Sequence, residues 1–249
     1  PEKLNISEPE RVFAVHKGYA DAGAQFITAN TFGANSLKYD NVDELVKAGV
    51  ALAKKAGKYV ALDIGPTGKL LKPMGDLEFE RAVELFAEVV RAGKDGSDVA
   101  IIETMSDMYE LKAAVIAVKE NSDLPIITSM IFDESGRLLT GGDVKSAVAM
   151  LEGLRVDAIG FNCGLGPKQM IPLVKELREC TSLPILVMPN AGLPESVDGK
   201  TVYNVSPDEF AQDMREIAKL GVSILGGCCG TTPKHIAKMI ELCKDIPDN

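Results

Sequence analysis

Three of the five cysteines in this chain stand in glycine-rich turns, each directly after a short apolar run typical of a buried strand. Cys163 lies in the turn 160–164, and Cys228 and Cys229 lie in the turn 226–233. Three thiolate ligands leave one position of a tetrahedral zinc open, which is the pattern of a catalytic site. A thiol substrate suits that position, because a bound cation converts the thiol into its nucleophilic thiolate form.

Other interpretations of these cysteines stay open on the residues alone. A single buried cysteine is most often a small core residue. Cys228 and Cys229 could form a redox pair, although this leaves Cys163 unexplained, and an iron–sulfur cluster lacks its usual close spacings. Segment 226–233 could also hold phosphate at a helix N-terminus. A zinc site gives a role to all three cysteines, and the other two, Cys180 and Cys243, fall at the ends of predicted outer helices.

Several other polar residues lie at or near predicted strand ends. Glu103 could pair with a substrate ammonium or serve a structural role, and the residues by themselves do not favour either. Asn190 follows the sixth predicted strand, and Asp63 begins a glycine-rich segment where a role in loop structure is favoured. His16 and His235 are predicted to be ordinary helix residues. No lysine ends a strand, which argues against a Schiff-base aldolase.

The elements that must position these residues alternate regularly between helix and strand. Helical apolar spacing and Pro-containing start signals predict eight helices, near 8–22, 42–57, 78–94, 106–121, 143–153, 168–180, 207–220 and 232–243. Short apolar runs predict seven strands, at 25–28, 59–63, 98–102, 125–129, 157–161, 184–188 and 223–226.

This alternation predicts an α/β protein with a parallel sheet. A (β/α)8 TIM barrel is favoured over an open doubly wound sheet, because no Gly-x-Gly-x-x-Gly turn follows an early strand. Since the chain opens on a helix and shows seven strands, we expect the first strand of the barrel to be absent from it. The length of 249 residues fits one domain over residues 1–249.

Composition limits the partners and the compartment. The formal net charge of −9 argues against nucleic acid and anionic membranes, which select basic surfaces. No apolar run approaches the roughly 20 residues of a membrane span, and no signal-peptide pattern opens the chain. An odd number of cysteines in a long core-forming sequence favours a reducing compartment, and we expect a cytoplasmic protein.

Segment 226–233 with His235 and Ile236 resembles the C-terminal signature of the homocysteine S-methyltransferases. Segment 162–164 matches the other zinc-cysteine segment of that family, and segment 28–35 is similar to the family's sequence after its second strand. Segments 63–68 and 132–141 most resemble the homocysteine domain of cobalamin-dependent methionine synthases. The resemblance extends over nearly the whole chain.

The resemblance implies a (β/α)8 barrel with a catalytic zinc and homocysteine as the methyl acceptor, giving methionine. It implies that Cys163, Cys228 and Cys229 are the zinc ligands and that Glu103 binds the homocysteine amino group. It places Asn190 near the metal, where it fills the fourth position in the absence of substrate. The family opens with a strand and an Asp-Gly-x-x-Gly-Thr loop, and residues 1–5 resemble the stretch just after that loop.

The methyl donor implied by the resemblance is methylcobalamin, carried by a separate domain or protein, so that cobalamin and folate domains in cis or in trans are expected partners. S-Methylmethionine or a betaine-like compound is the alternative donor. A phosphate-binding barrel lyase or aldolase and a redox module are the alternative classes of function.

Overall fold

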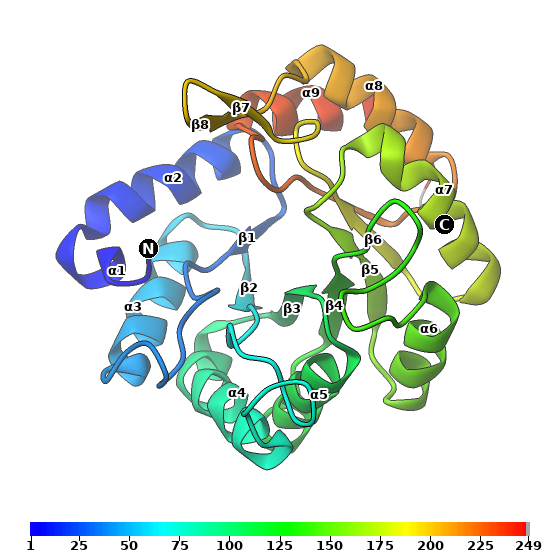
Figure 1. Cartoon of the computed structure of the whole chain (residues 1–249). Coiled ribbons are helices and arrows are strands. Elements are labelled where there is room, and N and C mark those ends of the chain that lie inside the picture. The colour runs from blue at the N-terminus through cyan, green and yellow to red at the C-terminus, as the bar shows by residue number, and fades with distance from the viewer. Residues whose placement is uncertain (248–249) are drawn as a thin grey trace. The chain divides into compact units, whose positions relative to one another are not determined.

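The computed structural model of the chain describes residues 1–247, and the chain divides into two compact units, Pro1–Thr128 and Ser129–Asn249. Each unit combines parallel strands with helices, and its elements can be followed by colour in Figure 1. The prediction of a single domain over residues 1–249 stays a prediction.

The first unit contains three strands that pair in chain order. Strand β1 pairs in parallel with β2, and β2 with β3 in a register that sets Asp63 opposite Ile101. Helices α2 to α5 lie outside these strands (Figure 1). The elements of this unit are α1 (Leu4–Ser7), α2 (Pro9–Asp21), β1 (Phe26–Thr28), α3 (Val42–Lys55), β2 (Tyr59–Ile64), α4 (Phe79–Gly93), a 3-10 turn (Lys94–Gly96), β3 (Val99–Met105) and α5 (Met108–Asn121).

Burial explains these strands and helices. Five of the six residues of β2 are buried, as expected for a parallel strand covered on both faces. Helix α4 buries Ala82, Leu85, Phe86 and Val89 on one face, a spacing of three and four residues that suits an amphipathic helix. The elements of this unit are therefore held by apolar contact between sheet and helices.

The second unit also pairs its parallel strands in chain order. Strand β5 pairs with β6, and β6 with β9. Strand β4 (Ile126–Met130) contains the boundary between the units. The other elements are α6 (Val144–Gly153), β5 (Ala158–Asn162), α7 (Pro167–Cys180), β6 (Ile185–Met188), β7 (Glu195–Val197), β8 (Lys200–Val202), α8 (Pro207–Ala218), β9 (Ile224–Leu225) and α9 (Pro233–Cys243).

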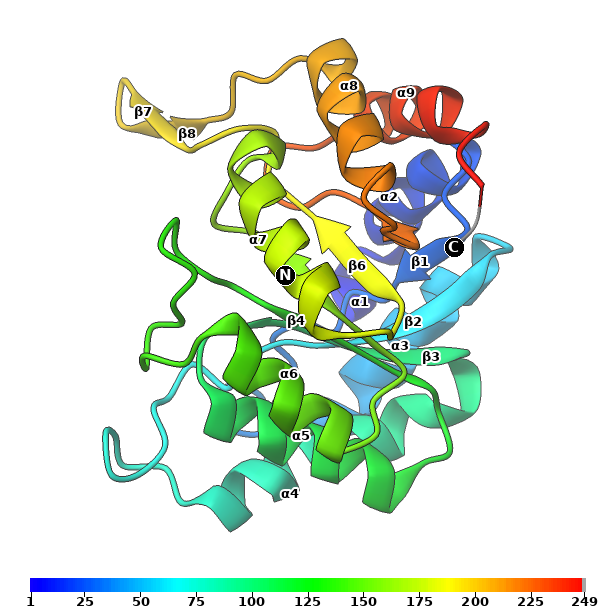
Figure 2. The same cartoon turned by 90° about the vertical axis from the view of Figure 1, so that its right-hand side faces the viewer.

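Strands β7 and β8 form a small antiparallel hairpin that the sequence analysis did not predict. Its turn contains Asp198 and Gly199, both with positive φ (51° and 73°), as a tight two-residue hairpin turn requires. Asp-Gly is a strong hairpin signal, but the flanking strands are three residues each and mostly exposed, so no hydrophobic pattern marks them. Figure 2 shows the hairpin projecting away from α7 and α8.

The predicted elements are confirmed at nearly every position. All eight predicted helices occur within two residues of their expected ends, and the seven predicted strands are present; the short helix α1 is an addition. Strand β3 runs on to Met105, so Glu103 lies inside the strand and not after it. The alternation of helices with parallel strands confirms the predicted α/β class.

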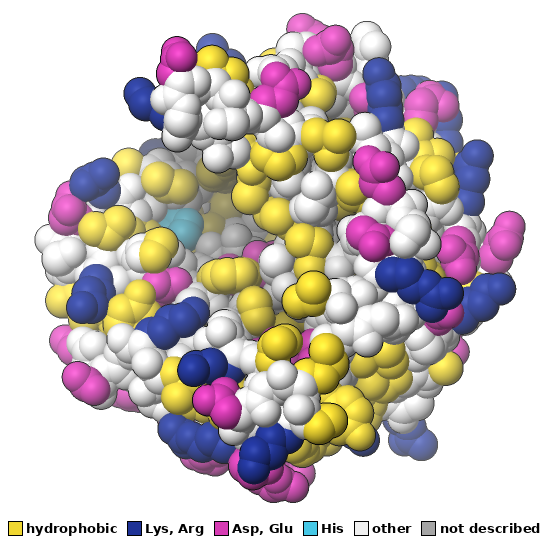
Figure 3. All heavy atoms as spheres, in the orientation of Figure 1, with side chains coloured by type: hydrophobic (Ala, Val, Ile, Leu, Met, Phe, Trp, Pro, Cys, Tyr) yellow, Lys and Arg dark blue, Asp and Glu magenta, His cyan; other side chains and the backbone are white. Residues whose placement is uncertain are grey.

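Charged side chains of both signs lie on the described surface. On the face shown in Figure 3, lysine and arginine side chains are interspersed with aspartate and glutamate and form no broad basic area. Among the helices of residues 1–247, none combines the length and the apolar character that crossing a bilayer requires.

Candidate metal centre

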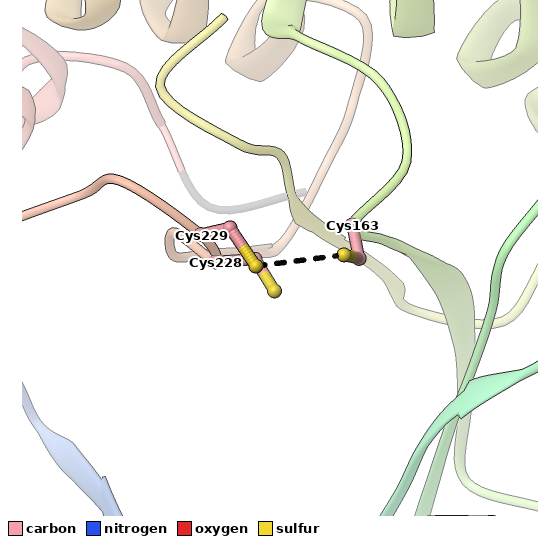
Figure 4. Close-up of side chains that lie close together, drawn as sticks. All are labelled: Cys163, Cys228 and Cys229. Atoms are coloured by element: carbon pink, nitrogen blue, oxygen red, sulfur yellow. Dashed lines mark hydrogen bonds between the residues drawn. The ribbon is translucent and has the colours of Figure 1, made fainter. Parts of the chain in front are cut away.

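The three cysteines singled out in the sequence come together in the second unit. The sulfurs of Cys163, Cys228 and Cys229 all lie within 4.8 Å of one another, and those of Cys163 and Cys229 are 3.8 Å apart. Figure 4 shows the three side chains converging, Cys163 from the end of β5 and the other two from the loop after β9. Cys229 is exposed, whereas Cys163 and Cys228 are half-buried.

Both cysteine loops are tied to the segment that follows β6. The backbone N–H of Cys163 donates to the carbonyl of Met188 at 3.1 Å, and that of Cys228 donates to Pro189 at 2.8 Å. Cys163 and Gly164 are consecutive residues in the left-handed region, with φ of 60° and 68°. This conformation is uncommon for a residue other than glycine, and such residues cluster at functional sites. It turns the chain sharply just where the strand ends.

Asn190 connects the two loops through its side chain. It is 2% exposed, its Oδ1 accepts from the backbone N–H of Cys229 at 3.0 Å, and its side chain also hydrogen-bonds Cys163. Because an amide donates only through Nδ2, the contact with a thiolate at Cys163 uses that nitrogen. Asn190 was predicted to lie near the metal, and its described contacts reach both cysteine segments.

The three sulfurs are electrostatically unequal. The hydrogen bond from Cys228, with further bonds from Gly164, Cys229 and Asn190, lowers the pKa of Cys163 to about 5 against the opposing effect of burial. Burial raises the pKa of Cys229, and the negative charge at Cys163 raises it further. The cluster thus holds one thiolate readily and resists a second, unless a cation offsets the charge.

A tetrahedral metal ion fits this arrangement. Two sulfurs that each lie 2.3 Å from one zinc at the tetrahedral angle are about 3.8 Å apart. The separation of 3.8 Å between Cys163 and Cys229 matches that edge and is far longer than the roughly 2.05 Å of a disulfide. The soft thiolate donor set also suits zinc. The five cysteines are all free thiols.

The start of α9 bears on the phosphate interpretation of segment 226–233. The N–H of Thr232 donates to Nδ1 of His235 at 3.2 Å, and the Thr232 hydroxyl lies 2.9 Å from the same nitrogen. The other ring nitrogen lies 3.0 Å from the carbonyl of Val205, which only accepts, so this nitrogen carries the proton. The N-cap amide is therefore turned toward the imidazole, which weakens the case for a phosphate cradle. His235 lies in a helix as predicted, and its buried ring also braces the loop before α8.

Glu103 lies in the first unit, half-buried in β3 and followed by Thr104 with φ of 61°. Its neighbour Asp63 was expected to have a role in loop structure but lies inside β2. Asp63 is only 7% exposed, and its Oδ1 has no hydrogen-bond partner among residues 1–247. Burial raises the pKa of Asp63 well above its usual range, and the charges of Glu103 and Glu2 raise it further.

His16 is likewise buried, and its Nε2 has no hydrogen-bond partner within the described residues.

Three polar residues around the cysteines were missed in the sequence. Asn162 directs its side-chain nitrogen at Cys228 Sγ from 4.0 Å, and Ser129 donates to Asn162 Oδ1 at 2.7 Å. Tyr203 hydrogen-bonds Cys229, and burial together with that bond raises its pKa to about 12. Asn162 was visible beside a candidate ligand, but Ser129 and Tyr203 lie 34 and 40 residues from Cys163, and no spacing signals them.

Comparisons with known proteins bear on this site. The model of the family described as "Homocysteine S-methyltransferase" matches residues 1–243. The chain is 32% identical over 269 residues to a methionine synthase of Mycobacterium leprae (strain TN), covering 98% of this chain and 22% of that protein. It is also 32% identical over 267 residues to the methionine synthase of Mycobacterium tuberculosis (strain ATCC 25618 / H37Rv), with the same coverage. The chain thus spans about a fifth of the length of these relatives.

Among solved structures, the chain resembles the metallated form of the homocysteine methyltransferase MmuM from Escherichia coli. The TM-score is 0.80 at 24% sequence identity, and the match covers 95% of this chain and 86% of that one. This likeness concerns the fold, and it confirms the predicted class of a TIM-barrel-like α/β protein.

Proposed function

Because the chain belongs to the homocysteine S-methyltransferase family, we propose that it binds homocysteine and transfers a methyl group to the homocysteine sulfur, giving methionine. The observation that carries the proposal is the convergence of Cys163, Cys228 and Cys229, whose sulfurs lie within 4.8 Å of one another. We propose that these thiolates hold one zinc ion and leave its fourth position to the substrate sulfur.

A bound zinc would supply a cation that keeps the substrate thiol deprotonated near neutral pH, where a free thiol with a pKa of about 8.5 is mostly protonated. The chain's own residues prepare this site. Cys163 is already a thiolate at neutral pH, since its pKa is about 5. Asn190 fixes the backbone of Cys229 and the sulfur of Cys163 together, so that the sulfurs stay in place.

The negative charge of the site favours methyl transfer to the substrate sulfur. Three cysteine thiolates and a divalent cation have a formal charge of −1, and the substrate thiolate makes it −2. This excess would limit how far a bound cation withdraws electron density from the substrate sulfur, so the three cysteine thiolates would keep that sulfur nucleophilic. In the proposed transfer the substrate sulfur would attack the donor methyl in line, and the bond between the donor and the methyl would break with its electron pair left on the donor. The thioether product carries no net charge on sulfur and would bind the site more weakly.

We propose that Glu103 binds the ammonium group of homocysteine. Its carboxylate is half-buried in β3 beside the buried Asp63, a local field that favours a cation. A carboxylate that fixes the ammonium group would restrict the motion of a short amino acid substrate.

The methyl donor proposed is methylcobalamin carried by another domain or protein, with folate and cobalamin domains in cis or in trans as partners. The length of the methionine synthases that the chain resembles supports this choice, since this chain accounts for 22% of each. S-Methylmethionine or a betaine-like compound is the second candidate donor. The free state of all five thiols fits a cytoplasmic setting, where thiols stay reduced.

The test is zinc analysis of the purified protein combined with methionine formation from homocysteine and a panel of the three donors. We expect about one zinc per chain, and Cys228→Ala should lose zinc and methyl transfer together. Cys180→Ala and Cys243→Ala remove the two thiols outside the cluster and should retain both. Full methyl transfer after complete zinc removal would contradict the proposal, and so would unchanged zinc content in Cys228→Ala.

A further inference from the structure

Two buried polar residues stand directly behind the candidate metal centre. Ser129 in β4 and Asn162 at the end of β5 are each 0% exposed, in strands whose residues are all buried. The Ser129 hydroxyl donates to Asn162 Oδ1 at 2.7 Å, and Asn162 Nδ2 lies 4.0 Å from Cys228 Sγ. Burying polar groups is unfavourable unless they are paired. The presence of two hydrogen-bonded polar side chains at these buried positions therefore indicates that they have a function.

We propose that Ser129 and Asn162 form a positioning pair that directs an amide N–H at the sulfur of Cys228 and thereby lowers the electron density of the metal-binding thiolates. The inference rests on the proposed metal centre and extends it beyond its three ligands. Neither residue contacts the substrate position in this proposal, because both act through Cys228.

The orientation of the Asn162 amide follows from its two neighbours. A thiolate accepts hydrogen bonds and cannot donate, so it attracts the Nδ2 end of the amide and repels Oδ1. With Nδ2 toward Cys228, Oδ1 points to Ser129, whose hydroxyl can rotate to donate to it. The serine therefore stabilises the amide orientation that a charged sulfur requires. An alanine at position 129 would leave the amide orientation less firmly fixed.

The other two sulfurs also have a side-chain donor. Asn190 hydrogen-bonds Cys163, and Tyr203 hydrogen-bonds Cys229. The three cysteine sulfurs thus each meet an amide or hydroxyl side chain, and the three side chains come from different segments of the second unit. Hydrogen bonds to metal-bound sulfur spread its negative charge, and groups that orient the ligands commonly contribute 10–100-fold in metal affinity. Such donors would offset the charge that a fourth thiolate adds to the centre.

The test uses Co²⁺ in place of zinc, because sulfur-to-cobalt charge-transfer absorption reports the electron density on the thiolates. Asn162→Leu keeps the approximate size of the side chain and removes the donor. We expect its charge-transfer band to move to lower energy and its zinc affinity, measured by competition with a chelator, to fall about tenfold or more. Ser129→Ala should shift the band in the same direction by a smaller amount.

Val187→Ala serves as a matched control, because Val187 in strand β6 is 0% exposed and its replacement removes buried volume without removing a donor. It should lower thermal stability and leave the band unchanged. A folded Asn162→Leu protein with an unshifted band would overturn the inference, even if zinc binds more weakly, because the role would then be structural. If Asn162→Leu fails to fold, Ser129→Ala decides by the same criterion. Wild-type protein that gives no thiolate-to-cobalt band would overturn the proposed metal centre itself.

Discussion

The side chain of Asn190 accepts a hydrogen bond at 3.0 Å from the backbone N–H of Cys229, and the carbonyl of Cys229 accepts one from Ala191 at 2.9 Å. The loop after β6 therefore holds the loop after β9 on both sides of one candidate ligand. The same Asn190 side chain reaches Cys163. Its amide links the two segments that must meet around a metal ion.

Replacing Asn190 with alanine should weaken metal binding. The change removes the acceptor for the Cys229 N–H and the donor for Cys163, and we expect zinc affinity to fall about 10–100-fold. Competition with a chelator measures this loss. Asn204→Ala is the control, because Asn204 is exposed and its Nδ2 donates to Glu195, away from the cysteines. Equal zinc affinities for the wild type and Asn190→Ala would contradict the bracing role.

Gly230 should not tolerate a side chain. It has φ of 78°, and an added Cβ would lie 2.4–2.7 Å from the ring of Tyr203. Gly57 has the same φ of 78° but no atom within 4 Å of such a Cβ. Both alanine variants carry the left-handed backbone cost of about 1–2 kcal/mol, and Gly230→Ala should lose more stability and also zinc affinity, because Tyr203 and the Cys229 loop must move.

Chemical denaturation and chelator competition on the two glycine variants measure this difference. The pair isolates the contact with Tyr203, since the backbone conformations match. If Gly230→Ala and Gly57→Ala lose the same stability and Gly230→Ala binds zinc unchanged, the Tyr203 ring moves aside without disturbing the cysteines, and the prediction is wrong.

Asp63→Asn should stabilise the protein, and the gain should grow with pH. The pKa of Asp63 is raised in the folded state, chiefly by burial and also by Glu103, so ionisation above its unfolded value of about 3.9 opposes folding. The wild-type protein should therefore lose stability as the pH rises from about 4 through the raised pKa, with no further loss from this group above it. The neutral amide removes this dependence.

Urea unfolding at pH 5, 6, 7 and 8 tests the Asp63 prediction, with a gain at pH 8 of about 1–3 kcal/mol expected from removing a buried carboxyl group whose ionisation the folded state disfavours. Asp21→Asn is the control, because Asp21 is exposed on α2 and pairs only weakly with Lys17 in water. A stability difference between Asp63→Asn and wild type that is constant over this range would refute the linkage.

Glu103→Gln should impair homocysteine binding more than zinc binding. If its carboxylate pairs with the substrate ammonium, the neutral amide loses a charged hydrogen bond, and the KM for homocysteine should rise about tenfold or more. Zinc content should stay at the wild-type level. Glu88→Gln on the outer helix α4 is the matched control. Unchanged homocysteine kinetics in Glu103→Gln would remove this residue from the proposed site.

The sequence by itself determined the order and type of nearly every element and the identity of the candidate ligands. Apolar periodicity and Pro-containing helix starts are local signals, so α8 and α9 could be placed to within two residues. The cysteines were recognisable because thiols in glycine-rich turns after strands are unusual, and parallel strands bring such turns to the same edge.

Tertiary structure alone decided what surrounds the sulfurs. The contacts of Asn162 with Ser129 and of Tyr203 with Cys229 join residues 26 or more positions apart, and no periodicity records them. The same holds for the hairpin of β7 and β8, whose strands are too short and exposed to show a pattern. The preference of a segment for helix or strand depends on neighbouring residues. The charge and hydrogen bonding of a site depend instead on which distant side chains the folded chain brings within a few ångströms.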